Sequence, residues 1–181
     1  LLLIYYSGHA DGDVLELGDT SLPFARLQKT LQSSVADVRI AFVDSCESGR
    51  LISLKGGRRG PEFEIRVSDE IASSGYAVFT SSAQNELSQE SAEIRGAVFT
   101  HYLASALRGA GDESGDGRVT LAEAYRYTYS RTLARTSRTV VGGQHPMYDF
   151  ALQGRGEIVL TNTEDSGTAL VVTSDASDRL L

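Results

Sequence analysis

Two reactive side chains each follow an apolar segment of this chain. His9 comes shortly after residues 1–6, which are almost wholly apolar, and Cys46 comes shortly after residues 38–43, which are nearly so. An imidazole beside a thiol can serve as the general base of a cysteine nucleophile. Of the three histidines, His9 is the one that ends an apolar run and meets a turn. This pair is therefore the first candidate for chemistry.

The segment between the two apolar runs predicts how they lie relative to each other. It has the length and pattern of a crossover helix, with apolar positions at Leu22, Ala25, Leu27 and Leu31. A strand–helix–strand unit makes its strands parallel, so both carboxyl ends lie at one edge of the sheet, where open α/β folds bind ligands. Neighbouring strands are about 4.8 Å apart. We therefore expect His9 and Cys46 side by side at that edge.

The rest of the chain predicts an α/β fold with a mostly parallel central sheet flanked by helices. The patterns indicate a third core strand, an edge strand, two amphipathic helices and a last strand, at 76–81, 63–67, 98–107, 121–133 and 156–160 respectively. Polar or glycine-rich composition predicts loops at 49–60, 84–95 and 135–144. The loop at 84–95 follows the third strand directly, so it is a candidate wall of a pocket.

Length and composition indicate one globular domain in a reducing compartment. The chain has 181 residues, of which 41% are hydrophobic and 23% are charged, as is typical of one domain with a proper core. A net charge of −7 argues against a nucleic-acid partner, because no basic excess can neutralise phosphates. No segment is long and apolar enough to predict a membrane span. The single cysteine excludes an intramolecular disulfide and favours the cytoplasm.

The motifs at the two strand ends resemble those of a known family. Tyr-Ser-Gly-His at 6–9 and Asp-Ser-Cys-Glu-Ser-Gly at 44–49 are similar to the signatures of caspases and metacaspases. Residues 79–86 and 96–103 resemble the strand, loop and helix start that come next in that family. Several ordered motifs over residues 1–160 make the resemblance specific. The chain is most similar in these motifs to bacterial metacaspase-like peptidases of the orthocaspase type.

The resemblance implies a fold and a domain organisation. It implies a caspase-like peptidase domain over residues 1–160. In that family a strand, a helix and another strand precede the histidine strand, so the N-terminal part of the domain would be missing from this chain. Residues 161–181 begin with a polar stretch and then turn apolar at 169–172. We interpret them as a linker and the start of a following domain.

The resemblance also implies roles for the candidate residues. Cys46 would be the nucleophile and His9 the general base and acid of a dyad, and the backbone N–H groups of Cys46 and Ala10 would hold the oxyanion. Many relatives have glycine where this chain has Ala10. Two alternatives stay open, because a lone cysteine is usually a small buried hydrophobe and a strand-end histidine can be structural. The polar turn at 45–49 favours a presented thiol.

Asp44 and Ser7 are candidates for substrate binding. Asp44 lies two residues before Cys46 and Ser7 lies two before His9, and residues i and i+2 of a strand share one face. A carboxylate at this place would attract a cationic P1 side chain. The resemblance implies that these positions line an S1 pocket for arginine or lysine. The alternative is that Asp44 caps a turn or holds a backbone N–H group.

These residues together predict a cysteine endopeptidase that cuts protein or peptide substrates after arginine or lysine. Lys55, Arg58 and Arg59 lie in the glycine-broken segment after the nucleophile, which makes them candidates for self-cleavage. A rival interpretation is a regulatory caspase-fold module, or one that a protein partner activates within a larger assembly. Binding rather than constitutive proteolysis would then be its main role.

Residues 112–123 fit a second motif, the twelve-residue calcium loop. The ligand positions are Asp112, Ser114, Asp116 and Glu123, and Gly117 stands at the sharp turn. Against calcium, the motif is unpaired, and Thr120 with Glu123 forms a helix capping box that needs no metal. We therefore expect no metal or cofactor in the candidate catalytic site. Calcium at this loop stays an alternative.

Overall fold

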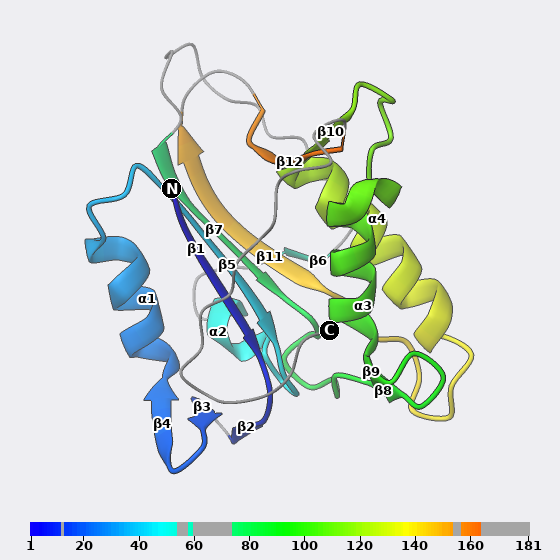
Figure 1. Ribbon diagram of the computed structural model, residues 1–181. Helices are drawn as coiled ribbons and strands as arrows, with labels where there is room; N and C mark the ends of the chain where they lie inside the picture. Colours follow the sequence, from blue (N-terminus) through cyan, green and yellow to red (C-terminus); the bar gives the residue numbers. More distant parts are fainter. Residues whose placement is uncertain (12, 54–57, 60–73, 154–156, 164–181) are drawn as a thin grey trace.

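The computed structural model has a central mixed sheet with helices on both faces (Figure 1). It describes residues 1–11, 13–53, 58–59, 74–153 and 157–163. The sheet has five strands in the order β1-β5-β7-β11-β6. Their bounds are Leu2–Ser7 (β1), Val38–Asp44 (β5), Ser74–Thr80 (β7), Met147–Gln153 (β11) and Arg58–Arg59 (β6). β1, β5 and β7 are parallel, and β11 runs antiparallel to both of its neighbours.

The two faces of the sheet carry separate cores. Helices α1 and α2 cover one face, and α3 and α4 cover the other (Figure 1). Their bounds are Phe24–Ser33 (α1), Arg50–Ser53 (α2), Val98–Ser105 (α3) and Leu121–Thr136 (α4). On β5, Ala41 and Val43 belong to the core under α1, whereas Ile40 and Phe42 belong to the core under α3 and α4. This alternation is what a strand buried on both faces requires, and it confirms the expected α/β architecture.

Shorter elements surround the central sheet. β2, β3 and β4 form an antiparallel meander between β1 and α1, β8 pairs with β9, and β10 pairs with β12. Their bounds are Ala10–Asp11 (β2), Val14–Leu17 (β3), Thr20–Pro23 (β4), Glu90–Ser91 (β8), Gly96–Ala97 (β9), Arg118–Thr120 (β10) and Val159–Asn162 (β12). A π-helical turn, η1 (Ala106–Ala110), continues α3. No helix in the described part of the chain has the length and apolar character to cross a bilayer.

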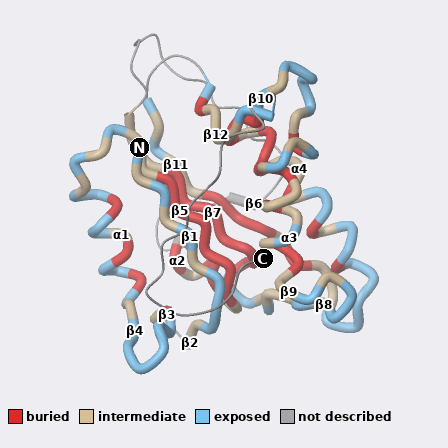
Figure 2. Tube along the Cα trace, in the orientation of Figure 1, coloured by how far each residue is buried: buried red, intermediate tan, exposed pale blue. Residues whose placement is uncertain are grey.

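Burial differs sharply between the inner strands and β1. Figure 2 shows buried residues along β5 and β7 and at the start of β11, and a paler, partly exposed β1. Along β1, exposed and half-buried residues alternate, and Leu3 and Tyr5 are 40% and 47% exposed. The strand that leads to Cys46 is therefore fixed in the core, and the strand that leads to His9 lies at the end of the described sheet.

Several local predictions are corrected by the structure. Ala25 is exposed, since the buried stripe of α1 follows a different set of positions. That stripe consists of Phe24, Leu27 and Leu31. The segment 49–60 contains α2 and β6, although a loop was expected there. β11 was not expected at all, because Asp149 interrupts its apolar pattern. This carboxylate accepts a hydrogen bond of 3.1 Å from the Tyr76 hydroxyl on β7.

The remaining expected elements occur with shifted ends. The third strand, the two amphipathic helices and the last strand correspond to β7, α3, α4 and β12. α4 continues to Thr136, and β12 continues to Asn162, past the expected domain boundary after residue 160. The edge strand expected at 63–67 lies outside the described residues, as do residues 164–181.

Candidate active site

The ends of β1 and β5 bring the two reactive residues to one edge of the sheet. The strands are adjacent and parallel, with Ser7 opposite Asp44, as the crossover pattern predicted. The pairing continues one step beyond the strands, because Gly8 N–H donates to the Asp44 carbonyl at 3.0 Å. His9 and Cys46 each follow directly from this paired end. The fold therefore places both residues at the edge of the sheet formed by the carboxyl ends of β1 and β5.

His9 has a fixed backbone and an exposed side chain. Its carbonyl accepts hydrogen bonds from the Tyr6 hydroxyl at 2.6 Å and from Glu16 N–H at 3.0 Å. The Tyr6 ring also packs over Gly8, where an added Cβ would lie 2.7 Å from the hydroxyl oxygen. The histidine imidazole is exposed, with no hydrogen bond to another described side chain. Hydrogen bonds therefore fix the backbone of His9, whereas no described residue holds its ring.

Cys46 is partly buried in the turn after β5. Its thiol donates a weak hydrogen bond to the Ser88 carbonyl, with sulfur and oxygen 3.9 Å apart. Among the described residues, no hydrogen bond joins Cys46 to His9. Catalytic hydrogen bonds are often long before substrate binds and tighten only in the complex. The two strands thus bring the candidate pair to one edge of the sheet, and the two side chains are not hydrogen-bonded to each other.

The turn at 45–49 packs tightly against the loop that follows β7. The Ser48 hydroxyl is buried and lies 3.3 and 3.4 Å from the hydroxyls of Ser81 and Ser82. At Gly49 an added Cβ would lie 2.6 Å from the Ala83 backbone carbon, so this close approach requires glycine. Packing against this loop therefore explains why the motif at 44–49 ends in Ser48 and Gly49.

Glu47, directly after the cysteine, has a left-handed backbone with φ of 53°. A residue with a Cβ costs about 1–2 kcal/mol in this conformation. The Glu47 carboxylate accepts a hydrogen bond of 3.0 Å from Arg50, and Arg50 also lies 3.2 Å from Asp13 in the turn after β2. The turn is therefore strained at the residue beside the thiol, and neighbouring groups hold it.

Asp44 is a buried carboxylate whose hydrogen-bond donors are neutral. It is 2% exposed. Its Oδ1 accepts from the Ser88 hydroxyl at 2.5 Å, and its Oδ2 accepts from Thr100 N–H at 3.2 Å and the Thr100 hydroxyl at 2.5 Å. Thr100 lies in the first turn of α3, so Asp44 does hold a backbone N–H group, the contact of the alternative interpretation. In the described part of the chain no cation pairs with this carboxylate.

Three residues of this site were missed by sequence reasoning. Ser88 and Thr100 bind Asp44 from segments far along the chain, and no local pattern marks either of them. The Tyr5 hydroxyl lies 2.7 Å from the Thr100 hydroxyl. Burial raises the pKa of Tyr5, and the charge of Asp44 adds to the increase, against the effect of hydrogen bonds to Thr100 and Ser7. Tyr5 shares the strand face of Ser7, and this i, i+2 relation was the available signal.

Ser7 and Ala10 lie on either side of His9 in sequence, on β1 and β2. Ser7 is exposed at the last paired position of β1. Ala10 is the first residue of β2, and its backbone is set by pairing with Leu15 on β3. The substrate-binding role of Ser7 and the oxyanion roles of the Ala10 and Cys46 N–H groups stay predictions.

The candidate self-cleavage residues divide into two groups. Lys55 lies outside the described residues. Arg58 and Arg59 form β6, whose main chain pairs with Tyr148 and Met147 of β11. These two arginines therefore lie in a short strand at the sheet's edge, where the sequence predicted an open loop.

In the loop at 112–123, the Asp112 carboxylate is hydrogen-bonded within the loop, whereas Glu113 pairs with Arg126 on α4. Asp112 accepts hydrogen bonds from the N–H groups of Gly115, Asp116 and Gly117 at 2.7, 3.2 and 3.0 Å. The described residues contain no group of three His, Cys, Asp or Glu side chains that could hold a metal ion. The acidic oxygens of Asp112 are thus turned toward the loop's own backbone.

The helix capping box at the start of α4 is present. The Thr120 hydroxyl accepts from Glu123 N–H, and the Glu123 carboxylate accepts from Thr120 N–H at 3.0 Å and from Ser114 N–H at 3.0 Å. Burial alone would raise the pKa of Glu123, but these hydrogen bonds outweigh it and lower the pKa. The capping interpretation of this motif is confirmed, and calcium binding stays an alternative.

Comparison with known proteins identifies the fold. No protein-family model matches the chain, and no curated protein matches it by sequence. Among solved structures, a crystal structure of caspase-1 from Spodoptera frugiperda is similar, with a TM-score of 0.57 and 15% sequence identity. The similarity covers 91% of this chain and 64% of that chain, so the chain spans less than two thirds of the caspase's length. The chain therefore has a caspase-like fold.

Proposed function

We propose that the protein is a cysteine endopeptidase of the metacaspase-like type that cleaves after arginine or lysine. Its substrates are proteins or peptides in the cytoplasm, where the single cysteine stays reduced. One observation carries the proposal: the paired ends of β1 and β5 put His9 and Cys46 at one edge of the sheet, next to the buried Asp44. The caspase-like fold supports it.

The chemistry follows from the order of groups at this edge. His9 takes the proton of the Cys46 thiol, and the thiolate attacks the carbonyl carbon of the scissile bond. Backbone N–H groups of Cys46 and Ala10 stabilise the oxyanion. As the C–N bond breaks, His9 gives the proton to the leaving amine. Water then attacks the thioester, releases the new carboxyl end of the substrate and restores the thiol.

Asp44 supports the preference for a basic P1 side chain. A buried carboxylate costs free energy unless it is paired and hydrogen-bonded. Here the hydrogen bonds from Ser88 and Thr100 fix both oxygens, yet no described cation balances the charge. A guanidinium or ammonium group of the substrate would supply that charge, whereas an aspartate side chain would be repelled.

The open dyad favours one alternative, a module that a protein partner activates. The Cys46 thiol donates to the Ser88 carbonyl, and no hydrogen bond joins the thiol to the exposed His9 ring. A partner or a bound substrate that shifts either side chain would close the dyad. In the binding-module form of this alternative, the fold recognises a partner and hydrolysis is absent.

A peptide panel varied at P1 tests the proposal. We expect hydrolysis after arginine and lysine, little after aspartate, and none with Cys46→Ala protein. Equal rates on arginine and aspartate peptides would refute the pocket assignment. A wild-type protein that neither cleaves nor reacts with a covalent thiol probe, alone or with a partner, would establish the binding module instead.

Self-cleavage is a finer consequence of the same specificity. Lys55, Arg58 and Arg59 follow the nucleophile by 9, 12 and 13 positions. Because Arg58 and Arg59 are strand-paired, we expect the first cut after Lys55. Intact-mass analysis of wild type and Cys46→Ala decides this: a wild-type chain that stays whole while it cleaves peptides would refute it.

A further inference from the structure

The peptide group between Cys46 and Glu47 is held from outside its own turn. Glu47 N–H belongs to that peptide group and donates to the Glu86 carbonyl at 3.0 Å. Glu47 has the left-handed φ described above, so this hydrogen bond holds a conformation that the chain would otherwise leave. Whatever fixes Glu86 therefore also fixes the backbone beside the thiol.

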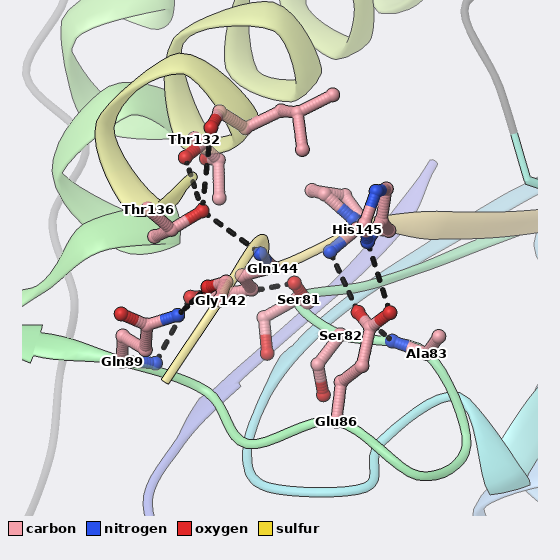
Figure 3. A network of polar contacts seen from close by, with 12 residues as sticks. Ser81, Ser82, Ala83, Glu86, Gln89, Thr132, Thr136, Gly142, Gln144 and His145 are labelled. Atoms are coloured by element: carbon pink, nitrogen blue, oxygen red, sulfur yellow. Dashed lines mark hydrogen bonds and ion pairs between the residues drawn. The ribbon is translucent and has the colours of Figure 1, made fainter. Parts of the chain in front are cut away.

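Glu86 is fixed by His145, as Figure 3 shows. Its Oε1 lies 2.9 Å from His145 Nδ1, and its Oε2 accepts from His145 N–H at 2.7 Å and from Ala83 N–H at 3.3 Å. Both side chains are mostly shielded, with 21% of Glu86 and 34% of His145 exposed. The Glu86 carboxylate thus joins the loop after β7 to the segment before β11.

His145 is itself anchored by its neighbour Gln144. Gln144 is fully buried. Its side-chain amide donates to the Ser81 carbonyl at 2.8 Å and accepts from Gln89 N–H at 2.9 Å, and its own N–H donates to the Thr136 hydroxyl at 2.8 Å (Figure 3). The position of His145 is therefore set by the sheet and by the end of α4.

We propose that Glu86 is a positioning residue for the nucleophile Cys46 and that His145 holds Glu86 in place. The contacts run from His145 to Glu86, from Glu86 to Glu47, and so to the thiol. This inference rests on the proposed role of Cys46. None of the three residues touches the reacting atoms in this scheme. They set the place of the sulfur and of the Cys46 N–H group relative to His9, and misplacement by about 1 Å can cost about a hundredfold in rate.

Two measurements read this positioning directly. Because Cys46 is the single cysteine of the chain, the rate of alkylation by iodoacetamide reports on this thiol alone and needs no peptide hydrolysis. Steady-state kinetics on an arginine P1 peptide give kcat and KM separately. A merely structural role for Glu86 would lower the melting temperature and leave both the alkylation rate and kcat of the folded protein unchanged.

The variants separate hydrogen bonding from charge. Glu86→Ala should lower the alkylation rate and kcat by about tenfold or more, with KM little changed. The backbone carbonyl that accepts from Glu47 N–H remains, but it loses the side-chain contacts to His145 and Ala83 that hold it in place. Glu86→Gln should recover most of both rates, since its amide oxygen still accepts from the backbone N–H groups. The matched control is Glu93→Gln. Glu93 lies on the same loop as Glu86, and the substitution removes the carboxylate of its exposed ion pair with Arg135 on α4. It should behave as wild type.

Each outcome decides one of the two claims. A folded Glu86→Ala protein with wild-type alkylation and kcat would overturn the positioning role while leaving the peptidase assignment intact. A wild type that hydrolyses no peptide, but whose alkylation still drops in Glu86→Ala, would overturn the peptidase assignment and support positioning. Should Glu86→Ala fail to fold, His145→Ala decides: a several-fold fall in alkylation supports the proposal, and an unchanged rate overturns it.

Discussion

The sheet edge at Cys46 and the loop at 112–123 both contain carboxylates that a sequence motif marked as functional. The hydrogen-bond donors to these carboxylates come from distant segments at the sheet edge and from nearby residues in the loop. Asp44 accepts from Ser88 and Thr100, which are 44 and 56 positions away. Asp112 and Glu123 accept from N–H groups of their own loop. Asp112 and Glu123 therefore have a local role, which is to fix the backbone of their own loop. Asp44 has no such local role. Distant elements hold it in a buried position, with no cation among the described residues, two positions before the Cys46 thiol.

Removing the Cys46 thiol should produce the largest effect: a loss of peptide hydrolysis with almost no loss of stability. We expect Cys46→Ala to lower hydrolysis of arginine P1 peptides by at least about 10⁴-fold, since members of a catalytic unit act together. The variant should melt within about a degree or two of wild type, because the thiol makes a single weak hydrogen bond to Ser88. Peptide hydrolysis and a thermal melt measure the two effects. Substantial residual turnover would remove Cys46 from the mechanism.

Neutralising Asp44 should come next, through specificity more than stability. Asp44→Asn keeps the size of the side chain and can still bond Ser88 and Thr100. Loss of a buried charge partner costs about 2–5 kcal/mol, so kcat/KM for arginine P1 peptides should fall by about 10²-fold or more. Initial rates on arginine and on neutral P1 peptides measure it.

The matched control for Asp44 is another sheet carboxylate. Asp149→Asn alters a carboxylate on β11 that bonds the Tyr76 hydroxyl, away from the paired ends of β1 and β5. Its kcat/KM should stay at the wild-type value. If Asp44→Asn and Asp149→Asn reduced arginine cleavage equally, Asp44 would be a structural carboxylate like those of the loop at 112–123.

The contrast between the regions also marks what sequence could predict. The apolar runs before His9 and Cys46 are local signals, and they correctly predicted two adjacent parallel strands. The capping box is local as well. Ser88 and Thr100 could not be predicted, because their roles depend on how distant segments fold onto Asp44. The same holds for Glu86 and its partner, which no pattern joins across 59 positions.

Removing the Glu123 carboxylate should lower the stability of the protein and leave its kcat unchanged. Glu123→Ala removes the acceptor for Thr120 N–H and Ser114 N–H. Thr120 is buried, and a buried donor left without a partner costs about 1–3 kcal/mol. We expect a lower free energy of unfolding and an unchanged kcat. Denaturant titration and peptide kinetics measure them. A large loss of kcat in folded protein would connect this loop to the site.

The stability that Glu123 contributes should depend on pH and not on calcium. Its folded pKa lies below the ordinary value of 4.5, so its contribution is present above that value and is lost as pH falls through the folded pKa. The difference in stability between wild type and Glu123→Ala should therefore be constant near neutral pH and shrink in acid. Because Asp112 and Glu123 already accept from the loop's own N–H groups, the melting temperature should be the same in calcium and in chelator. A rise with calcium would identify a calcium site.

The smallest effect is expected at Arg50, which links the two sides of the site through solvent-exposed ion pairs. Its guanidinium contacts Asp13 on the His9 side and Glu47 on the Cys46 side. The hydrogen bond that Arg50 donates to the Glu47 carboxylate is the main cause that raises the Arg50 pKa, so the side chain stays charged. Exposed pairs contribute little, and salt screens them over about 3 Å at 1 M. Arg50→Gln should therefore change kcat/KM by less than about twofold, and only at low salt. A larger loss that persists at 1 M salt would mean that the link between the two turns, rather than the anchor at Glu86, sets the geometry of the dyad.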